Sequence, residues 1–149
     1  MKYLFICLQN KARSPAAARY FSTLLKEKDA RSYEIKSAGV FDNFPTVLTK
    51  AMMEEADTIF VMDKEVLSWI KKEGLLPESN AGKDVIDLDI PDALDPYWGD
   101  FHPEWLDSKN PAETERYKNR YKGKRLIQAV AEKREIFEKY IKDASKNEK

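Results

Sequence analysis

Four short segments with β-strand patterns alternate along this chain with segments of helical spacing, and this alternation constrains the fold more than any other feature. The strands are predicted at Lys2–Cys7, Tyr33–Ala38, Thr58–Met62 and Val85–Leu88. Three helices are predicted at Ser14 to about Lys28, with Ser14 as N-cap, at Thr46–Glu55 and at Lys64–Lys72. From Ala112 to about Ala144 the sequence predicts one helix or two, with an interruption near Gly123. Strands separated by helices pair in parallel through right-handed crossovers. The sequence therefore predicts an α/β fold of three layers, with a doubly wound four-stranded parallel sheet and an extended C-terminal helix.

Length and composition favour one globular domain over residues 1–149, with a C-terminal helical extension at about 112–144. One cysteine and one histidine are too few for an iron–sulfur cluster or a structural zinc site, so we expect no metal and no cofactor. No apolar run approaches the roughly 20 residues of a membrane-spanning helix, and the apolar N-terminal stretch is too short for a signal peptide. We expect a cytoplasmic protein that does not act at a membrane, and the oligomeric state stays open.

The segment between the first strand and its helix has the chemistry of a phosphate-binding loop. A loop at a helix N-terminus directs several backbone N–H groups at one anion, and Arg13 adds a fork that suits phosphate. Cys7 lies at the carboxyl end of the strand, where a thiolate would attack phosphorus, and Ser14 is placed to donate a hydrogen bond to it. The predicted phosphate-binding residues are Leu8, Gln9, Asn10, Lys11, Ala12, Arg13 and Ser14.

An acidic segment follows the fourth strand and should emerge at the same edge of the sheet. A leaving alcohol needs a proton, which a carboxylic acid on a loop commonly supplies. Asp95 lies in a Pro-aromatic-aromatic-Gly turn, where Tyr97 and Trp98 are expected to bind an aromatic leaving group. The aspartates at 87, 89, 92 and 95 lack the spacing and the glycine of an EF-hand. We therefore favour a mostly solvated loop with one working acid over a cation site.

The two motifs together resemble the low-molecular-weight protein tyrosine phosphatases. The chain has Cys-Leu-x-Asn-x-x-Arg-Ser-Pro directly after an N-terminal strand and Asp-Pro-Tyr-Trp-Gly much later, with Ser37-Ala38-Gly39 and Met62-Asp63 as further landmarks over roughly residues 1–100. This resemblance implies a flavodoxin-like sheet, with Cys7 as nucleophile, Arg13 as phosphate clamp and Asp95 as general acid. It also implies that Asn10 and Ser37 brace the loop by hydrogen bonds.

Several positions depart from that family's pattern. Gln9 stands where the family usually has glycine, Ala12 where a second cysteine is common, and Lys11 where a pocket residue is apolar. The run from Leu88 to Asp92, with His102 to Leu106 after it, resembles a smaller branch of predicted tyrosine phosphatases. In that alignment Asp92 competes with Asp95 as the acid.

The leading interpretation is hydrolysis of a phosphomonoester, with phosphorylated protein or a small phosphomonoester as substrate. Six cations and no acidic residue lie between Arg116 and Arg125, which is typical of the exposed face of a helix but also suits a nucleotide or RNA phosphate. A third interpretation is a non-catalytic phosphate-binding module. Arsenate reduction would need an external thiol, because the chain has no second cysteine. A sugar phosphotransferase subunit would not need Arg13 together with the late aspartate.

Overall fold

A four-stranded parallel sheet forms the middle of the molecule. The computed structural model describes residues 1–8, 12–30, 32–41, 46–76, 84–92, 94, 102 and 110–146, with side chains up to Ile141. The strands lie in the order β2-β1-β3-β4, all parallel. Their bounds are β1 (Lys2–Cys7), β2 (Glu34–Gly39), β3 (Thr58–Val61) and β4 (Asp84–Asp87).

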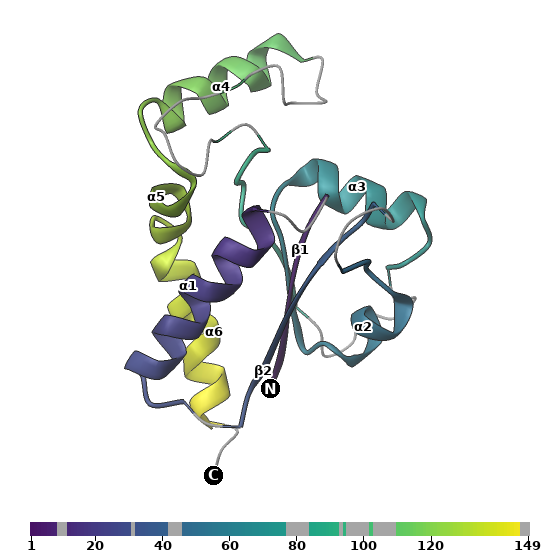
Figure 1. Cartoon of the computed structure of the whole chain (residues 1–149), viewed down its shortest axis with the longest axis vertical. Helices are drawn as coiled ribbons and strands as arrows, with labels where there is room; N and C mark the ends of the chain where they lie inside the picture. Colours follow the sequence, from purple (N-terminus) through teal and green to yellow (C-terminus); the bar gives the residue numbers. More distant parts are fainter. Residues whose placement is uncertain are drawn as a thin grey trace.

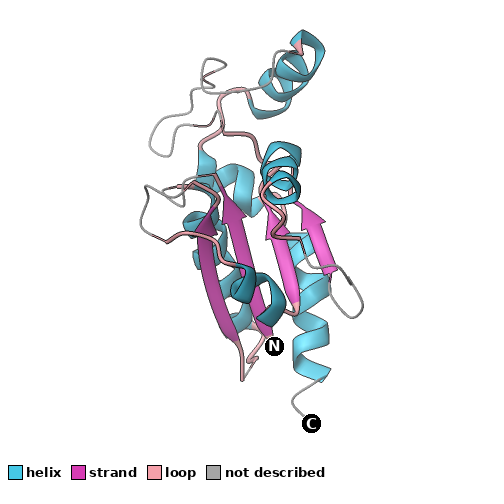
Figure 2. Ribbon diagram, turned by 90° about the vertical axis from the view of Figure 1, so that its right-hand side faces the viewer, coloured by secondary structure: helices cyan, strands magenta, loops and turns pink. Residues whose placement is uncertain are grey.

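Helices cover both faces of this sheet. The helices of the described part are α1 (Arg13–Glu27), α2 (Lys50–Glu55), α3 (Lys64–Lys72), α4 (Pro111–Tyr121), α5 (Leu126–Ala131) and α6 (Arg134–Lys146). Figure 1 shows α1, α5 and α6 on one side of the sheet and α2 and α3 on the other. Figures 1 and 2 both place α4 beyond the carboxyl edge of the sheet. The predicted three-layer α/β class is confirmed.

The C-terminal extension is more divided than the sequence suggested. We expected one helix or two over 112–144, and the structure has three. The first break falls where the sequence placed it, because Gly123 adopts a φ of +70° that ends α4. The second is a turn at Glu132 and Lys133, where Lys133 N–H donates to the Val130 carbonyl. Helical spacing continues across this turn, so the pattern of apolar residues alone does not reveal it.

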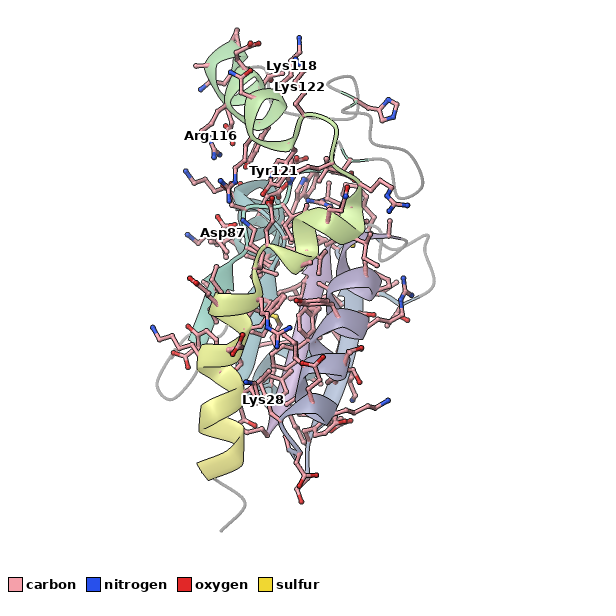
Figure 3. The ribbon with its side chains drawn as sticks, turned by 90° about the vertical axis from the view of Figure 1, so that its left-hand side faces the viewer. Lys28, Asp87, Arg116, Lys118, Tyr121 and Lys122 are labelled. Carbon is pink, nitrogen blue, oxygen red and sulfur yellow. The ribbon has the colours of Figure 1, made fainter. Side chains whose placement is uncertain are left out.

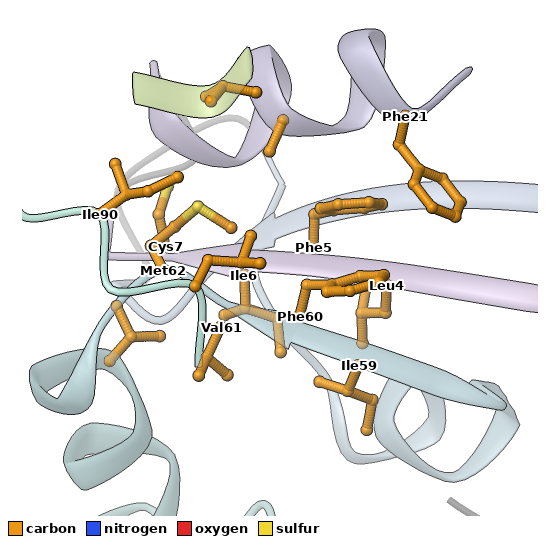
Figure 4. Packing of buried hydrophobic residues seen from close by; sticks show 14 of the residues in the cluster. Leu4, Phe5, Ile6, Cys7, Phe21, Ile59, Phe60, Val61, Met62 and Ile90 are labelled. Carbon is orange, nitrogen blue, oxygen red and sulfur yellow. The ribbon is translucent and has the colours of Figure 1, made fainter. Parts of the chain in front are cut away.

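The core is built around β1, whose last five residues are all buried. The strand has paired neighbours on both edges and helices on both faces, which explains its nearly continuous apolar sequence. On the α1 face, Phe5 stacks on Phe60 with ring centroids 4.8 Å apart. Phe137 packs edge-on against this pair, and Phe21 packs against it with its ring tilted. Figure 4 shows three of these rings beside one another along β1.

Two predicted helix starts were wrong. We expected Ser14 to cap α1, but the helix begins at Arg13 with Ala12 as its N-cap and no side-chain cap. Ser14 lies inside the first turn of the helix, and its hydroxyl bonds to Cys7. The second is α2, which begins at Lys50 and not at Thr46, because the Thr49 side chain accepts from Met52 N–H and caps it there.

No helix in the described residues combines the length and the apolar character needed to cross a membrane.

Candidate active site

Cys7 lies at the carboxyl end of the central strand, next to the beginning of α1. Its Sγ atom is 3.0 Å from the Ser14 hydroxyl, and only 3% of the residue is exposed. The Cys7 carbonyl accepts from Val40 N–H at 3.1 Å, and the Leu8 carbonyl accepts from Phe41 N–H at 2.9 Å. Pairing between β1 and the chain after β2 therefore continues past the strand end and fixes the backbone that carries the thiol.

The core-facing side of α1 explains why Arg13 and Ser14 point inward. Its buried residues include Arg13, Ala17 and Phe21, which follow one another at intervals of four and so share one face of the helix. The face that packs Phe21 into the aromatic core thus carries Arg13 to the carboxyl edge of the sheet. The packing of α1 consequently fixes the direction of both polar side chains.

Arg13 is an unusual residue for this place, because it is a cation in the first turn of a helix and is 3% exposed. Both the helix dipole and burial disfavour a positive charge there. Its Nη1 atom donates to Asp63 Oδ2 at 2.8 Å and to the Ile90 carbonyl at 2.7 Å. Burial lowers the pKa of Arg13, but the carboxylates of Asp63 and Asp92 outweigh burial and raise it overall. A buried cation at a helix N-terminus costs free energy, and the carboxylates around Arg13 offset this cost. A residue kept in such a place marks a candidate functional site.

Asp63 serves two elements at once. One carboxylate oxygen accepts from Val66 N–H at 3.0 Å and caps α3, while the other binds Arg13. The sequence identified Met62-Asp63 only as a family landmark and gave Asp63 no role. An aspartate between a strand and a helix signals a cap, but its second partner lies 50 residues away in the sequence.

Asp92 lies on the other side of the same guanidinium. Its Oδ1 atom is 3.6 Å from Arg13 Nε, beyond hydrogen-bond distance, and 40% of its side chain is exposed. Burial raises the pKa of Asp92, and the attraction of Arg13 reduces this effect without cancelling it. The segment reaches this place because Leu88 N–H donates to the Val61 carbonyl and Ile90 N–H to the Met62 carbonyl. Figure 4 shows Ile90 and Met62 gathered beside Cys7.

The structure thus brings together part of the predicted site. Cys7, Leu8, Ala12, Arg13 and Ser14 lie at one edge of the sheet, with Asp63 and Asp92 added to them. The predicted residues Gln9, Asn10, Lys11, Asp95, Tyr97 and Trp98 lie outside the described residues. In the described residues, no group of three or more side chains could hold a metal ion.

This arrangement favours an anion in front of Cys7. The N-terminus of α1 directs its positive dipole end to this place, and Arg13 contributes a fixed cation whose Nη1 atom is already bound by the protein. The opposite edge of the guanidinium, from Nε to Nη2, suits two oxygens of one ligand. A sulfur atom, a hydroxyl and a carboxyl group of raised pKa surround that position.

Of three comparisons with known proteins, only the comparison with solved structures found matches. No protein-family model and no curated protein matches the sequence. Solved structures do match, among them YfkJ from Bacillus subtilis, at 18% identity and TM-score 0.55 over 94% of this chain and 96% of that one. A low-molecular-weight protein tyrosine phosphatase from T. tengcongensis matches at 22% identity and TM-score 0.51, over 89% and 99%.

A third match is a variant of the YwlE arginine phosphatase with a phosphorylated active-site serine, at 18% identity and TM-score 0.52 over 90% and 96% of the two chains. At this level of identity the likeness concerns the fold, which agrees with the strand order and with the position of Cys7. The chain therefore has the fold of the low-molecular-weight protein tyrosine phosphatases.

Proposed function

We propose that this chain is a cysteine-dependent phosphomonoesterase that acts through a phosphocysteine intermediate, with phosphotyrosine in proteins as its main substrate class. The observation that carries the proposal is the contact between Cys7 Sγ and Ser14 Oγ at the start of α1, with the buried Arg13 beside it. The phosphatases among the structural matches support the same chemistry. We expect the enzyme to work in the cytoplasm as a single domain and to need no metal or cofactor.

In the first step the Cys7 thiolate attacks phosphorus, the S–P bond forms and the bond to the leaving oxygen breaks. Arg13 and the N–H groups at the start of α1 stabilise the charge on the equatorial oxygens. A carboxylic acid gives its proton to the leaving oxygen. In the second step water attacks the phosphocysteine, the same carboxylate accepts a proton from this water, and the S–P bond breaks. Ser14 donates to the sulfur as it leaves.

Asp92 is the acid that the described geometry supports. It lies beside the edge of Arg13 that would face the phosphate, and its pKa is raised by burial, which favours the protonated form. A bound phosphate dianion would occupy Arg13 and repel a carboxylate at this distance. Substrate binding would therefore favour protonation of Asp92 further. Asp95, the acid predicted from the family pattern, lies outside the described residues.

Two alternatives predict different behaviour. The tyrosines of the basic segment, Tyr117 and Tyr121, are 3% and 0% exposed, so they cannot stack on bases. This weakens the case for a nucleotide or RNA substrate, which would then depend on the cations alone. A non-catalytic phosphate-binding module would use the same cradle without turnover.

The test is the hydrolysis of para-nitrophenyl phosphate with EDTA present, over acidic to neutral pH, by wild type, Cys7→Ser and Ser68→Ala. Ser68 lies exposed on α3, so Ser68→Ala shows whether a substitution outside the site changes the measured activity. We expect turnover in wild type and Ser68→Ala and none in Cys7→Ser. Well-folded wild type that binds phosphate without turnover would contradict the proposal and favour the binding module.

The substrate class needs a second comparison. We would measure kcat/KM on a phosphotyrosine peptide, a phosphoarginine peptide and a short RNA that ends in a phosphate, each at low and high salt. The proposal expects the phosphotyrosine peptide to be the best substrate. A preference for RNA that falls steeply with salt would favour the nucleic-acid alternative.

A further inference from the structure

Asp89 joins the segment after β4 to the C-terminal helix α4. Arg116 donates from Nη1 and Nη2 to the two carboxylate oxygens at 2.9 and 3.1 Å. The Tyr117 hydroxyl donates to Oδ1 at 2.7 Å, and the Tyr121 hydroxyl donates to the Asp89 carbonyl at 2.7 Å. One residue thus receives four hydrogen bonds from one helix. Figure 3 shows Arg116 and Tyr121 above Asp87, which ends β4.

The partners of Asp89 are firmly placed. Tyr117 and Tyr121 are buried, and the Arg116 guanidinium lies over the Tyr117 ring, 4.3 Å from its centroid. Burial and the bond to Asp89 raise the pKa of Tyr117, so its hydroxyl remains a donor. Burial opposes the charge on Asp89, but the hydrogen bonds from Arg116 and Tyr117 prevail and lower its pKa. The carboxylate is therefore ionised over the pH range in which a phosphatase works.

The backbone of Asp89 shows that these contacts determine its conformation. Its φ is +55°, in the left-handed region, which costs a residue other than glycine about 1 kcal/mol. The Asp87 side chain accepts from Asp89 N–H at 2.8 Å and supports the turn. Strain of this kind persists only where the surrounding contacts fix the residue. The turn then directs Ile90 back towards β3, where its N–H donates to the Met62 carbonyl.

The residues immediately after Asp89 form the part of the site that faces Arg13. The carbonyl of the next residue, Ile90, accepts from Arg13 Nη1, and Asp92 comes two residues later beside Arg13 Nε. We infer that Asp89, bound by Arg116, Tyr117 and Tyr121, is a positioning residue that holds segment 88–92 against Arg13 and so places Asp92 for proton transfer. The inference builds on the proposed function, and it gives α4 a role in the reaction although α4 does not carry the nucleophile.

The first experiment compares Asp89→Asn and Tyr121→Phe with wild type on two aryl phosphates, one with a good leaving group (para-nitrophenol) and one with a poor one (phenol). A poor leaving group depends more on the acid. We expect Asp89→Asn to lower kcat/KM for phenyl phosphate by about 10- to 100-fold and to affect para-nitrophenyl phosphate much less. Tyr121→Phe keeps the ring and removes only one of the four hydrogen bonds to Asp89, so it should shift the same ratio by less.

The control is Asp57→Asn. Asp57 also accepts a hydrogen bond through its carboxylate, in its case from the backbone N–H of Lys2 at 2.8 Å, but it lies at the opposite edge of the sheet. We expect its kcat/KM to stay within about two-fold of wild type for both substrates. Combining Asp89→Asn with Asp92→Asn should give little further loss on phenyl phosphate, because both changes remove the same proton transfer.

A second measurement does not depend on turnover. Hydrogen exchange followed by mass spectrometry should show faster exchange in peptides covering 88–92 for Asp89→Asn and Tyr121→Phe. In these two variants, peptides from β1 should exchange as in wild type. In Asp57→Asn, the peptides covering 88–92 should exchange as in wild type. Unchanged exchange at 88–92, or equal losses on both aryl phosphates, would overturn the inference. If the wild type shows no Cys7-dependent turnover, the proposed function fails, and the exchange data alone then decide whether Asp89 holds the segment.

Discussion

The hydroxyl of Ser14 and the thiol of Cys7 form a buried pair whose contribution can be measured separately from binding. A hydrogen bond to a charged group contributes about 1.5–3 kcal/mol, so Ser14→Ala should slow the release of Cys7 from phosphorus by about 10-fold or more. The breakdown of the phosphocysteine would then limit turnover. Stopped-flow measurement should show a burst of para-nitrophenolate close to one equivalent of enzyme. Ser68→Ala, an exposed serine to alanine change, should leave the wild-type time course unaltered.

The proposed mechanism makes Asp92 the residue that governs the pH dependence. Burial raises the pKa of Asp92, and the general acid must be protonated before it can donate. The rate for a poor leaving group should therefore fall as the pH rises through this raised pKa. Asp92→Asn should remove that alkaline decline and lower kcat by about 100-fold. Asp95→Asn is the matched comparison, and a loss of the decline in Asp95→Asn alone would assign the acid to Asp95.

The sequence anticipated part of the site at this scale. The spacing of Cys7 and Ser14 predicted their hydrogen bond, because both lie where a strand passes into a helix and only a short loop separates them. Asp63 and the Ile90 carbonyl could not be predicted in the same way. They meet Arg13 across 50 and 77 residues of sequence, and this meeting depends on the strand order and on how the chain leaves β3 and β4.

Among the elements, α3 depends directly on the site, because Asp63 both caps it and binds Arg13. Asp63→Asn should keep the cap, since asparagine is a good N-cap, but it leaves Arg13 short of a buried partner. Breaking such a buried pair costs about 3–5 kcal/mol. Asp63→Ala also removes the cap, which should cost about 1 kcal/mol more. Urea unfolding of the two variants would separate these contributions.

Thr49→Ala provides the reference for a cap alone. Thr49 caps α2 through its side chain, in an exposed hydrogen bond to Met52 N–H at 3.2 Å. We expect a loss of about 1 kcal/mol and unchanged phosphatase activity. If Asp63→Asn were no less stable than Thr49→Ala, the ion pair with Arg13 would contribute little to the fold. Its role would then be limited to orienting the guanidinium.

The strands were predicted more accurately than the helix boundaries. The predicted and observed ends of the four strands differ by at most one residue, because each strand is a short segment with a clear pattern, alternating in the case of Tyr33–Ala38. Helix ends depend on which side chain caps them, and Ser14 and Thr49 both qualify by type. Only the tertiary structure decides which of them is an N-cap. The Ser14 hydroxyl bonds to Cys7, whereas the Thr49 hydroxyl accepts from Met52 N–H in its own helix.

On the scale of the whole molecule, the C-terminal helices return to the N-terminal half of the chain. The Tyr3 hydroxyl donates to the Tyr140 carbonyl at 3.1 Å, and Arg134 on α6 donates to Glu27 on α1 at 3.0 Å. The sequence predicted the helical extension at about 112–144, but not which face of the sheet it would cover. Such long-range contacts arise from the complementary shapes of two surfaces, which one sequence does not reveal.

Phe137 is the side chain through which α6 enters the core. It is fully buried, and its ring centroid lies 5.4 Å from those of both Phe21 and Phe60, so this one side chain packs against both α1 and the sheet. Replacing a buried phenylalanine by alanine costs about 3–5 kcal/mol, part of it from the cavity left behind. Phe137→Ala should therefore lower the urea midpoint strongly.

The same change should hardly alter kcat/KM under conditions where the variant is folded, because Phe137 packs on the part of α1 that lies away from Arg13. Ile127→Ala on α5 is the control, since 59% of Ile127 is exposed and its loss should change stability by about 0.5 kcal/mol or less. If Phe137→Ala reduced kcat/KM in the folded state, α6 would contribute to the position of α1 and hence of Arg13. If it left the urea midpoint unchanged, the stability of the aromatic core would not depend on Phe137.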